Sequence, residues 1–340
     1  MERTILGRTG LRVTRCGFGA LPIQRISFDE AGAILKKAYD SGINFFDTAR
    51  YYTDSEEKMG KALSDVRKEI IIATKGMAKD KKTLLESLET SLRNLKTDYV
   101  DIFQLHNPDH LPDPEDPDGL YAGLLEARKQ GKTRFIGITN HGIERAVKAA
   151  ESGLYDTIQF PVNALSAEAD LGLIDICREK NVGLIAMKAL SGGLLSRAAV
   201  AFAFLRQYEN VVPIWGIQRM KELEEFLEFE KNPPELDDDM WKQIMEYRTE
   251  LAGEFCRGCG YCMPCPAGIY IRDAARISLL LSRAPYQPFL QESYKEKMDL
   301  INNCIECGQC KSKCPYGLDT PNLLKRELKR YTDFYKEHVH

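Results

Sequence analysis

The fold is decided by Asn44-Phe45-Phe46-Asp47-Thr48-Ala49-Arg50-Tyr51-Tyr52, a short apolar run that leads into an acid and two phenols. We interpret this stretch as a buried strand that ends at the floor of an active site. An ionised carboxylate directly after two phenylalanines is costly unless a cation pairs with it, because burial removes its water. The sequence supplies a candidate cation in Lys75, which ends the apolar run 70–74.

A third strand-like run, residues 99–105, ends in His106. Three successive strands therefore each end in a titratable side chain. In a barrel of parallel strands these ends lie on one rim, where loops assemble catalytic sites. The structural alternative is that Asp47 caps the following helix and that His106 is a rim residue with its hydrogen bonds satisfied. Matching chemistry at three consecutive strand ends favours the catalytic interpretation.

The residue types indicate proton transfer to a carbonyl group. A tyrosine is a weak acid at neutral pH, and a nearby ammonium stabilises its phenolate. Lys75, held by Asp47, is a candidate to do this for Tyr52. His106 would orient the carbonyl oxygen while Tyr52 donates the proton that a hydride-reduced carbonyl needs. The predicted substrate is a small carbonyl compound or the corresponding alcohol.

These residues resemble the aldo-keto reductase family over about residues 1–230. The shared motifs are Leu6-Gly7-Arg8-Thr9-Gly10-Leu11-Arg12-Val13, Gly17-Phe18-Gly19, Asp47-Thr48-Ala49, Ser55-Glu56-Glu57, Ala73-Thr74-Lys75 and Leu105-His106. The resemblance implies that Asp47, Tyr52, Lys75 and His106 form a catalytic tetrad.

Length and pattern predict an α/β fold built on a (β/α)8 TIM barrel. The 340 residues suffice for a barrel of about 250 residues and a smaller module. After a hairpin that turns at Thr9-Gly10 and a first strand near Cys16 to Ile23, strand-like runs alternate with helical patterns. The runs end near Thr48, Lys75, His106, Asn140, Asn163, Leu190 and Gly216. The helical patterns include 28–41, 83–95, 143–152 and 167–181. No Gly-x-Gly-x-x-Gly motif follows a strand, so an open dinucleotide-binding sheet is not expected.

Charge and hydropathy limit the partners. Lys and Arg total 47 against 50 Asp and Glu, a formal charge of −3, so no nucleic acid partner is expected. The opening residues have no apolar signal segment, and no stretch of about 18 apolar residues follows. We expect a cytoplasmic protein without a membrane partner.

The resemblance also implies a pyridine-nucleotide site, for NADP or NAD. Thr139, Asn140 and Gln159 match family positions that hold the nicotinamide carboxamide, and Met187 stands where the family commonly stacks a tyrosine. Ser191, Gly192 and Gly193 would either bring backbone N–H groups to a phosphate or form a tight turn into a helix. Gln218, Arg219 and Lys221 are the candidates in the phosphate-reading segment, where few cations are present, so the choice between NADP and NAD stays open.

The loop 107–119 follows His106 and holds four prolines among five acidic residues. A loop of this length on a catalytic rim is either a substrate lid or a solvated connector.

Eight of the ten cysteines lie in two motifs near the carboxyl terminus: Cys256, Cys259, Cys262 and Cys265 before Pro266, and Cys304, Cys307, Cys310 and Cys314 before Pro315. This spacing is typical of two [4Fe–4S] clusters, in which the cysteine before proline ligates the other cluster. One cluster would then take Cys256, Cys259, Cys262 and Cys314, and the other Cys304, Cys307, Cys310 and Cys265. The first motif is one residue short before Cys265, and structural zinc is the alternative. Cys16 and Cys177 are expected to be buried thiols.

Helical patterns at 270–282 and 286–301 make this module resemble the helical two-cluster ferredoxin domains of respiratory iron–sulfur subunits. We therefore predict a barrel at 1–235, a bridging helix at 236–250 and a ferredoxin-like domain at 251–340. The predicted function is an aldo-keto reductase-type oxidoreductase with electron transfer through two clusters. One alternative is an electron-transfer protein with a flavin or another non-nicotinamide site in the barrel. A second is a zinc-stabilised NAD(P)H carbonyl reductase.

Clusters carry one electron at a time and a hydride carries two, so a flavin is the usual intermediary. Electrons would enter through the clusters, from an external electron-transfer protein, or the clusters would have a side role in ordinary NAD(P)H-dependent reduction.

Overall fold

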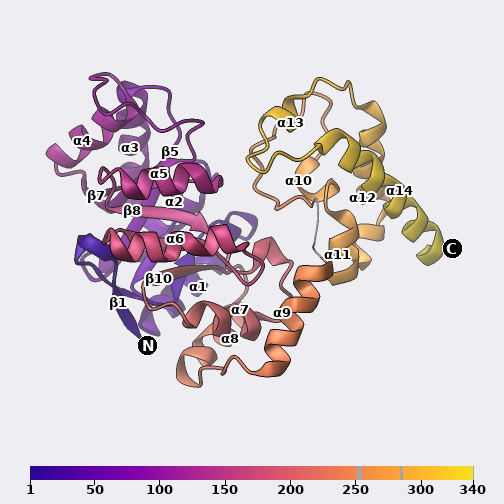
Figure 1. Ribbon diagram of the computed structural model, residues 1–340, viewed down its shortest axis with the longest axis horizontal. Helices are drawn as coiled ribbons and strands as arrows, with labels where there is room; N and C mark the ends of the chain where they lie inside the picture. The colour runs from indigo at the N-terminus through magenta and orange to yellow at the C-terminus, as the bar shows by residue number, and fades with distance from the viewer. Residues whose placement is uncertain (251–254, 284–285, 340) are drawn as a thin grey trace. The chain divides into compact units, whose positions relative to one another are not determined.

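The computed structural model describes residues 1–250, 255–283 and 286–339 (Figure 1). The chain forms two compact units, which are Met1–Ala189 with Ala198–Asp237, and Leu190–Arg197 with Asp238–His340. Within the described ranges, no helix is both long and apolar enough to cross a membrane.

The first unit is a closed barrel of eight parallel strands, as predicted (Figure 1). Its strands are β3 (Gly17–Gly19), β4 (Phe45–Asp47), β5 (Ile71–Gly76), β6 (Val100–His106), β7 (Thr133–Thr139), β8 (Thr157–Pro161), β9 (Gly183–Met187) and β10 (Val211–Gly216). They pair in chain order, and β10 closes the barrel on β3. Helices cover the outer face, so the strands are buried on both sides and appear in the sequence as apolar runs rather than alternating ones.

The helices of this unit are α1 (Phe28–Asp40), α2 (Ser55–Leu63), α3 (Lys81–Leu95), α4 (Leu120–Lys129), α5 (Ile143–Glu151), α6 (Glu168–Glu179), α7 (Ala198–Arg206) and α8 (Met220–Lys231). Local sequence explains several ends. Ser27 and Glu30 form a capping box at the start of α1. Leu84, Leu88 and Leu92 are buried on one face of α3, at the spacing of a helix that packs on a sheet. The helix α8 ends before two prolines, which cannot continue it.

A hairpin of β1 (Arg3–Ile5) and β2 (Arg12–Thr14) precedes the barrel. Its turn is a short 3-10 helix, η1 (Gly7–Thr9), that ends at Gly10 with φ of 66°. Leu6, Leu11 and Val13 pack in one cluster with apolar residues from inside the barrel, among them Phe45. Since Phe45 opens β4, the hairpin closes the amino-terminal end of the barrel.

Three strand boundaries differ from the prediction. The run near Cys16 to Ile23 contains only the three-residue strand β3, and Pro22 starts the 3-10 helix η2 (Pro22–Arg25) because its ring fixes φ. The strand β8 ends at Pro161, before Asn163. The strand β9 ends at Met187, before Leu190, because Lys188 takes a φ of 55° that extended backbone excludes.

The second unit is helical. It contains η4 (Ser191–Gly193), α9 (Asp238–Glu250), α10 (Ile271–Ala274), α11 (Ile277–Arg283), η5 (Gln287–Leu290), α12 (Glu292–Asp299), η6 (Leu300–Asn303), α13 (Gln309–Ser312) and α14 (Thr320–His338). The bridging helix predicted at 236–250 overlaps α9. Both longer predicted helices are interrupted. The helix predicted at 270–282 is interrupted at Ala275, where backbone N–H groups donate to the Asp273 carbonyl. The helix predicted at 286–301 begins instead with η5, which has Pro288 in its first turn.

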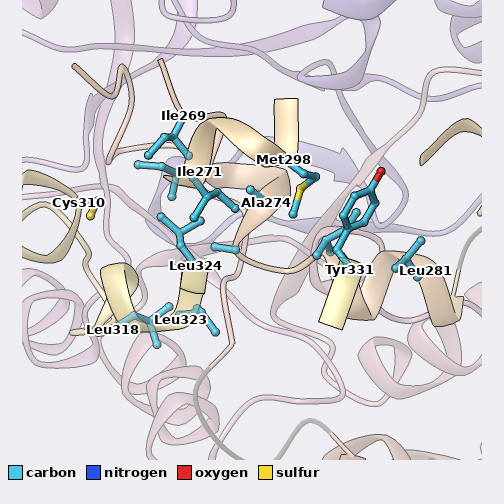
Figure 2. Packing of buried hydrophobic residues seen from close by; sticks show 13 residues of the cluster. Ile269, Ile271, Ala274, Leu281, Met298, Cys310, Leu318, Leu323, Leu324 and Tyr331 are labelled. Atoms are coloured by element: carbon cyan, nitrogen blue, oxygen red, sulfur yellow. The ribbon is translucent and has the colours of Figure 1, made fainter. Parts of the chain in front are cut away.

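An apolar cluster holds these short helices together. Figure 2 shows Ile271, Met298, Leu324 and Tyr331 within it. The buried Glu327 of α14 adds a polar brace, because its carboxylate accepts hydrogen bonds from the backbone and hydroxyl of Ser278.

Candidate active site and cluster-binding motifs

Adjacent strand ends bring together the predicted tetrad. Asp47 ends β4, Lys75 lies near the end of β5, and His106 ends β6. Parallel pairing places Asp47 beside Ala73 and Lys75 beside Gln104, so the three side chains share the carboxyl end of the barrel. All three residues are buried.

Asp47 and Lys75 form a buried ion pair. The Lys75 Nζ donates to Oδ1 and Oδ2 of Asp47 at 2.7 and 2.8 Å, and to the Thr48 carbonyl at 2.7 Å. Three acceptors match the three N–H groups of the ammonium. Burial raises the pKa of Asp47 and lowers the pKa of Lys75, and the charge of each partner opposes the shift of the other.

Two glutamines support the Asp47 carboxylate from inside the barrel. The Gln159 Nε2 donates to Asp47 Oδ1 at 3.3 Å, and its Oε1 accepts from Gln104 Nε2 at 2.9 Å. Sequence reasoning missed Gln104. The signal in the sequence was a polar residue inside the strand-like run 99–105. The structure shows that Gln104 is fully buried, and a buried amide needs a hydrogen-bond partner.

Tyr52 lies in the loop before α2. Its ring meets the His106 ring edge-on at 5.8 Å, and the Lys75 Nζ is 5.4 Å from the centroid of the Tyr52 ring. Tyr51 is 58% exposed, and its ring centroid is 6.4 Å from that of His106. The phenol beside the Lys75 charge is therefore that of Tyr52.

The imidazole of His106 is neutral at pH 7. Burial, followed by the positive charge of Lys75, lowers the pKa of His106 to about 3. A neutral imidazole keeps one N–H donor and one acceptor. It can therefore orient a carbonyl oxygen by hydrogen bonding without competing with Tyr52 as the acid.

The loop that carries Tyr52 is fixed by hydrogen bonds that were not predicted. The Ser55 hydroxyl pairs with that of Thr48 at 2.9 Å and donates to the Ala20 carbonyl at 2.9 Å. The buried Lys58 ammonium donates to the carbonyls of Ile23 and Ile26. These contacts connect α2 to the loop after β3.

The predicted carboxamide site contains an unsatisfied amide. Thr139 ends β7, and its hydroxyl accepts from the Asn107 backbone at 2.9 Å. Asn140 is fully buried, and neither its Nδ2 nor its Oδ1 has a partner among the residues that the structure describes. A buried amide is normally hydrogen-bonded, so this side chain fits an absent group that offers both a donor and an acceptor. A nicotinamide carboxamide is such a group.

The remaining nucleotide candidates are divided between the units. Met187 ends β9 and packs on the cluster inside the barrel. Ser191, Gly192 and Gly193 belong to the second unit, and all three have positive φ values.

A carboxylate occupies the start of α8. The Glu222 Oε2 accepts from the backbone N–H groups of Gln218 and Arg219 at 2.9 and 3.1 Å. Its Oε1 binds the Arg219 guanidinium at 2.6 Å. Glu222 thus binds Arg219, a cation predicted to read a phosphate, and two backbone N–H groups at the start of the helix.

The loop 107–119 is attached to α3. The Lys81 backbone N–H donates to the Asp118 carbonyl at 2.8 Å, and the Lys81 ammonium reaches the Pro117 carbonyl at 3.4 Å. The Arg145 guanidinium also donates to the Asp109 carbonyl at 3.1 Å.

The two cysteine motifs interleave in space. One pocket of the second unit is lined by Cys262 and Cys265 of the first motif together with Cys304, Cys307 and Cys310 of the second. Burial raises the pKa of Cys310, and negative charge at Cys304 and Cys265 adds to the rise. Burial likewise raises the pKa of Cys256, and its further causes include Cys259 and Cys314, so these thiols are also close. Cys16 and Cys177 are buried, as predicted.

Thiolates and an apolar lining are the donor set and surroundings that an iron–sulfur cluster requires. Ile269, Ile271 and Leu324 supply apolar lining in the pocket with Cys265. Within the described part of the chain, no three His, Cys, Asp or Glu residues converge closely enough to hold a single metal ion.

Residues 15–199, just over half of the chain, match the Aldo/keto reductase family. The chain belongs to the aldo/keto reductase family. Residues 255–319 of this family member match a 4Fe-4S dicluster domain, which confirms the predicted fusion.

Known relatives resemble the barrel part. The L-galactose dehydrogenase of Arabidopsis thaliana is 32% identical over 218 residues, covering 58% of this chain and 67% of that protein. Aldo-keto reductase YhdN of Bacillus subtilis is 31% identical over 215 residues, covering 58% and 64%. The chain thus spans about two thirds of the length of these relatives. The thermostable aldo-keto reductase Tm1743, solved with the inhibitor epalrestat, has a TM-score of 0.61 at 28% identity and covers 73% of this chain and 100% of that one.

Proposed function

We propose that this aldo/keto reductase reduces a small carbonyl compound, or oxidises the corresponding alcohol, with Tyr52 as the proton donor. The observation that carries the proposal is the Tyr52 ring against both the buried Lys75 charge and the neutral His106. His106 orients the substrate oxygen, and Tyr52 gives it a proton as the carbonyl carbon becomes an alcohol carbon. Lys75 stabilises the phenolate that remains on Tyr52. The alcohol direction is supported by the relative named as a dehydrogenase.

We propose NAD(H) as the preferred nucleotide. A bound nicotinamide would supply or accept the hydride, with its carboxamide on Asn140, whose amide has no partner among the described residues. Thr139 and Gln159 lie beside this position, since they pair across β7 and β8. Glu222 supports NAD(H) over NADP(H), because a carboxylate repels a 2′-phosphate and is a natural acceptor for a ribose hydroxyl.

For the second unit, we propose two [4Fe–4S] clusters with crossed ligands. Cys256, Cys259, Cys262 and Cys314 hold the first cluster, and Cys304, Cys307, Cys310 and Cys265 hold the second. The interleaved motifs and the dicluster match support this assignment over structural zinc.

The second cluster exchanges electrons with an external electron-transfer protein. Cys307 is exposed, and Ile305 beside it is 65% exposed, so this cluster offers the shorter path to a docked partner.

The test of the catalytic site compares Tyr52→Phe with Tyr51→Phe. Removing a general acid costs about 100- to 10,000-fold in turnover, so we expect a loss of this size for Tyr52→Phe with NADH affinity unchanged within about twofold. Tyr51→Phe is the matched control, because this exposed phenol lies farther from His106. Equal turnover of the two variants, measured where chemistry limits the rate, would assign the acid elsewhere.

The test of electron transfer is anaerobic. NADH is added to the oxidised protein while the visible absorbance of the clusters is followed. We expect slow bleaching with NADH alone and fast bleaching once catalytic FMN is present, because a hydride must be divided into single electrons. Fast bleaching without flavin would show that no intermediary is needed. Zinc in place of iron and sulfide would end the cluster assignment.

A further inference from the structure

The second unit contains a buried arginine that the proposed chemistry does not use. Arg276 lies between α10 and α11 and is 9% exposed. A guanidinium does not lose its proton in proteins, so a permanent charge is fixed inside this unit. Such a charge is costly unless it has partners.

Protein partners satisfy only part of this guanidinium. One terminal nitrogen donates to the Gly192 carbonyl at 2.9 Å. The other is 3.8 Å from Asp273, which is too long for a hydrogen bond. The Nε–H is buried without a partner among the residues that the structure describes. A donor and part of a charge are therefore left for another group.

The first cysteine motif packs directly on this guanidinium. A Cβ added to Gly258, whose φ is 63°, would lie 2.9 Å from the guanidinium carbon. A side chain at Gly258 would displace the guanidinium, so the backbone between Cys256 and Cys259 approaches the charge closely.

We propose that Arg276 raises the reduction potential of the cluster held by Cys256, Cys259, Cys262 and Cys314. The inference rests on the proposed cluster assignment. Reduction adds one electron and one negative charge to a cluster, and no bond or proton has to change. A nearby cation and an N–H donor to sulfur stabilise the reduced form more than the oxidised form, and hydrogen bonds and charge are known determinants of cluster potential.

The second cluster lacks an equivalent residue within the described part of the unit. The cation beside Cys304 is Lys325, which is 58% exposed and paired with Glu306 at 2.6 Å. Water and the carboxylate screen this charge. The two clusters are therefore unequal, and an electron that enters at the exposed Cys307 passes to the cluster beside Arg276.

The experiment is an anaerobic redox titration of the full-length, cluster-loaded protein by electron paramagnetic resonance. We expect Arg276→Gln to lower one of the two reduction potentials by about 59 mV. This shift corresponds to a tenfold change in the equilibrium constant for one-electron reduction. Arg276→Lys keeps the charge and should recover at least half of the shift. The matched control is Lys336→Gln, which removes an exposed cation of α14. It should change neither one-electron equilibrium constant by more than about twofold.

The affected cluster is identified in a Cys307→Ser background, which changes the spectrum of the second cluster. The inference is supported if the Arg276→Gln shift stays with the unchanged signal. It is overturned if both one-electron equilibrium constants of Arg276→Gln stay within about twofold of wild type while the iron and sulfide content is full. It is also overturned if the shift follows the altered signal. If Arg276→Gln loses its clusters, Arg276→Lys decides: wild-type cluster loading with a reduction potential that is still lowered would overturn the inference. Wild-type protein without sulfide would instead refute the proposed function.

Discussion

Lys75→Met removes the cation from a carboxylate that is 2% exposed. The side-chain donor that remains for Asp47 is Gln159 at 3.3 Å. Removing one partner of a buried ion pair costs about 3–5 kcal/mol, because the other charge stays buried without compensation. Asp47→Asn should cost a similar amount, since the Lys75 ammonium then faces a neutral amide and the Thr48 carbonyl. Domains are stable by about 5–15 kcal/mol, so each variant should fold with a reduced margin.

The double variant Asp47→Asn/Lys75→Met separates stability from catalysis. It contains no unpaired charge, so we expect it to be more stable than the sum of the single effects predicts, by about 2–3 kcal/mol. Carbonyl reduction should stay at least about 100-fold below wild type in Lys75→Met and in the double variant, because the charge beside Tyr52 is missing in both.

Lys75→Met should also change how stability depends on pH. Without the ammonium, burial holds the folded-state pKa of Asp47 above its unfolded value of about 3.9. Between these two values the folded state binds more protons than the unfolded state. Stability therefore falls as pH rises from about 4 through the folded-state pKa. The loss relative to wild type should be smaller at pH 6 than at pH 8.

The assay is anaerobic urea unfolding at pH 6, 7 and 8, followed by tryptophan fluorescence in a Trp241→Phe background. Trp215 then reports on the barrel, where it is fully buried. Additive single effects, with a coupling below about 0.5 kcal/mol, would refute the charge argument. A greater stability of Lys75→Met at pH 8 than at pH 6, after wild type is subtracted, would refute the assigned burial of the carboxylate.

Three further variants test other parts of the site. Glu222→Gln should lower the KM for NADPH by about tenfold and leave that for NADH nearly unchanged, because it frees Arg219 from its ion pair; equal effects on both cofactors in steady-state kinetics would exclude this role. Asn140→Leu should weaken nucleotide binding about tenfold while raising the stability of the nucleotide-free protein by about 1–3 kcal/mol, and a loss of both in titration calorimetry and urea unfolding would mean that the amide is satisfied. Cys314→Ser should alter the cluster of Cys256, Cys259 and Cys262, and a paramagnetic change confined to the cluster of Cys307 would contradict the crossed ligands.

The barrel could be predicted because its signals are local. Apolar runs of strand length alternate with helical patterns, and parallel strands put their carboxyl ends on one rim. Asp47, Lys75 and His106 therefore come together from sequence order alone. The predicted strand ends were less accurate, for example that of β9. This strand ends where Lys188 takes a positive φ, and a lysine rarely does so, so its presence in the sequence does not indicate the end.

Other features depend on contacts between distant residues. Gln104, Gln159 and Asp47 form a chain of hydrogen bonds across three strands, whereas the expected burial of Asp47 implied only its ion pair with Lys75. The grouping of Leu190–Arg197 with the second unit could not be inferred from its Gly-rich composition. Arg276 lies in a segment predicted to be one helix, where a single arginine is normally solvated. The structure shows instead that Arg276 is buried between α10, which ends at Ala274, and α11, which begins at Ile277.

Unequal clusters would solve the problem of electron number that the fusion of these two domains creates. A hydride carries two electrons, and two [4Fe–4S] clusters together hold two, one each. If a flavin divides the hydride, the first electron should rest on the cluster beside Arg276, where the reduced form is stabilised. The second electron then has the cluster of Cys307 available, and because Cys307 is exposed, the proposed external carrier would collect single electrons there. In the opposite direction the same order lets a carrier load the Arg276 cluster first and hold that electron until a second arrives. Arg276 would then allow a one-electron carrier to serve a two-electron reaction at Tyr52.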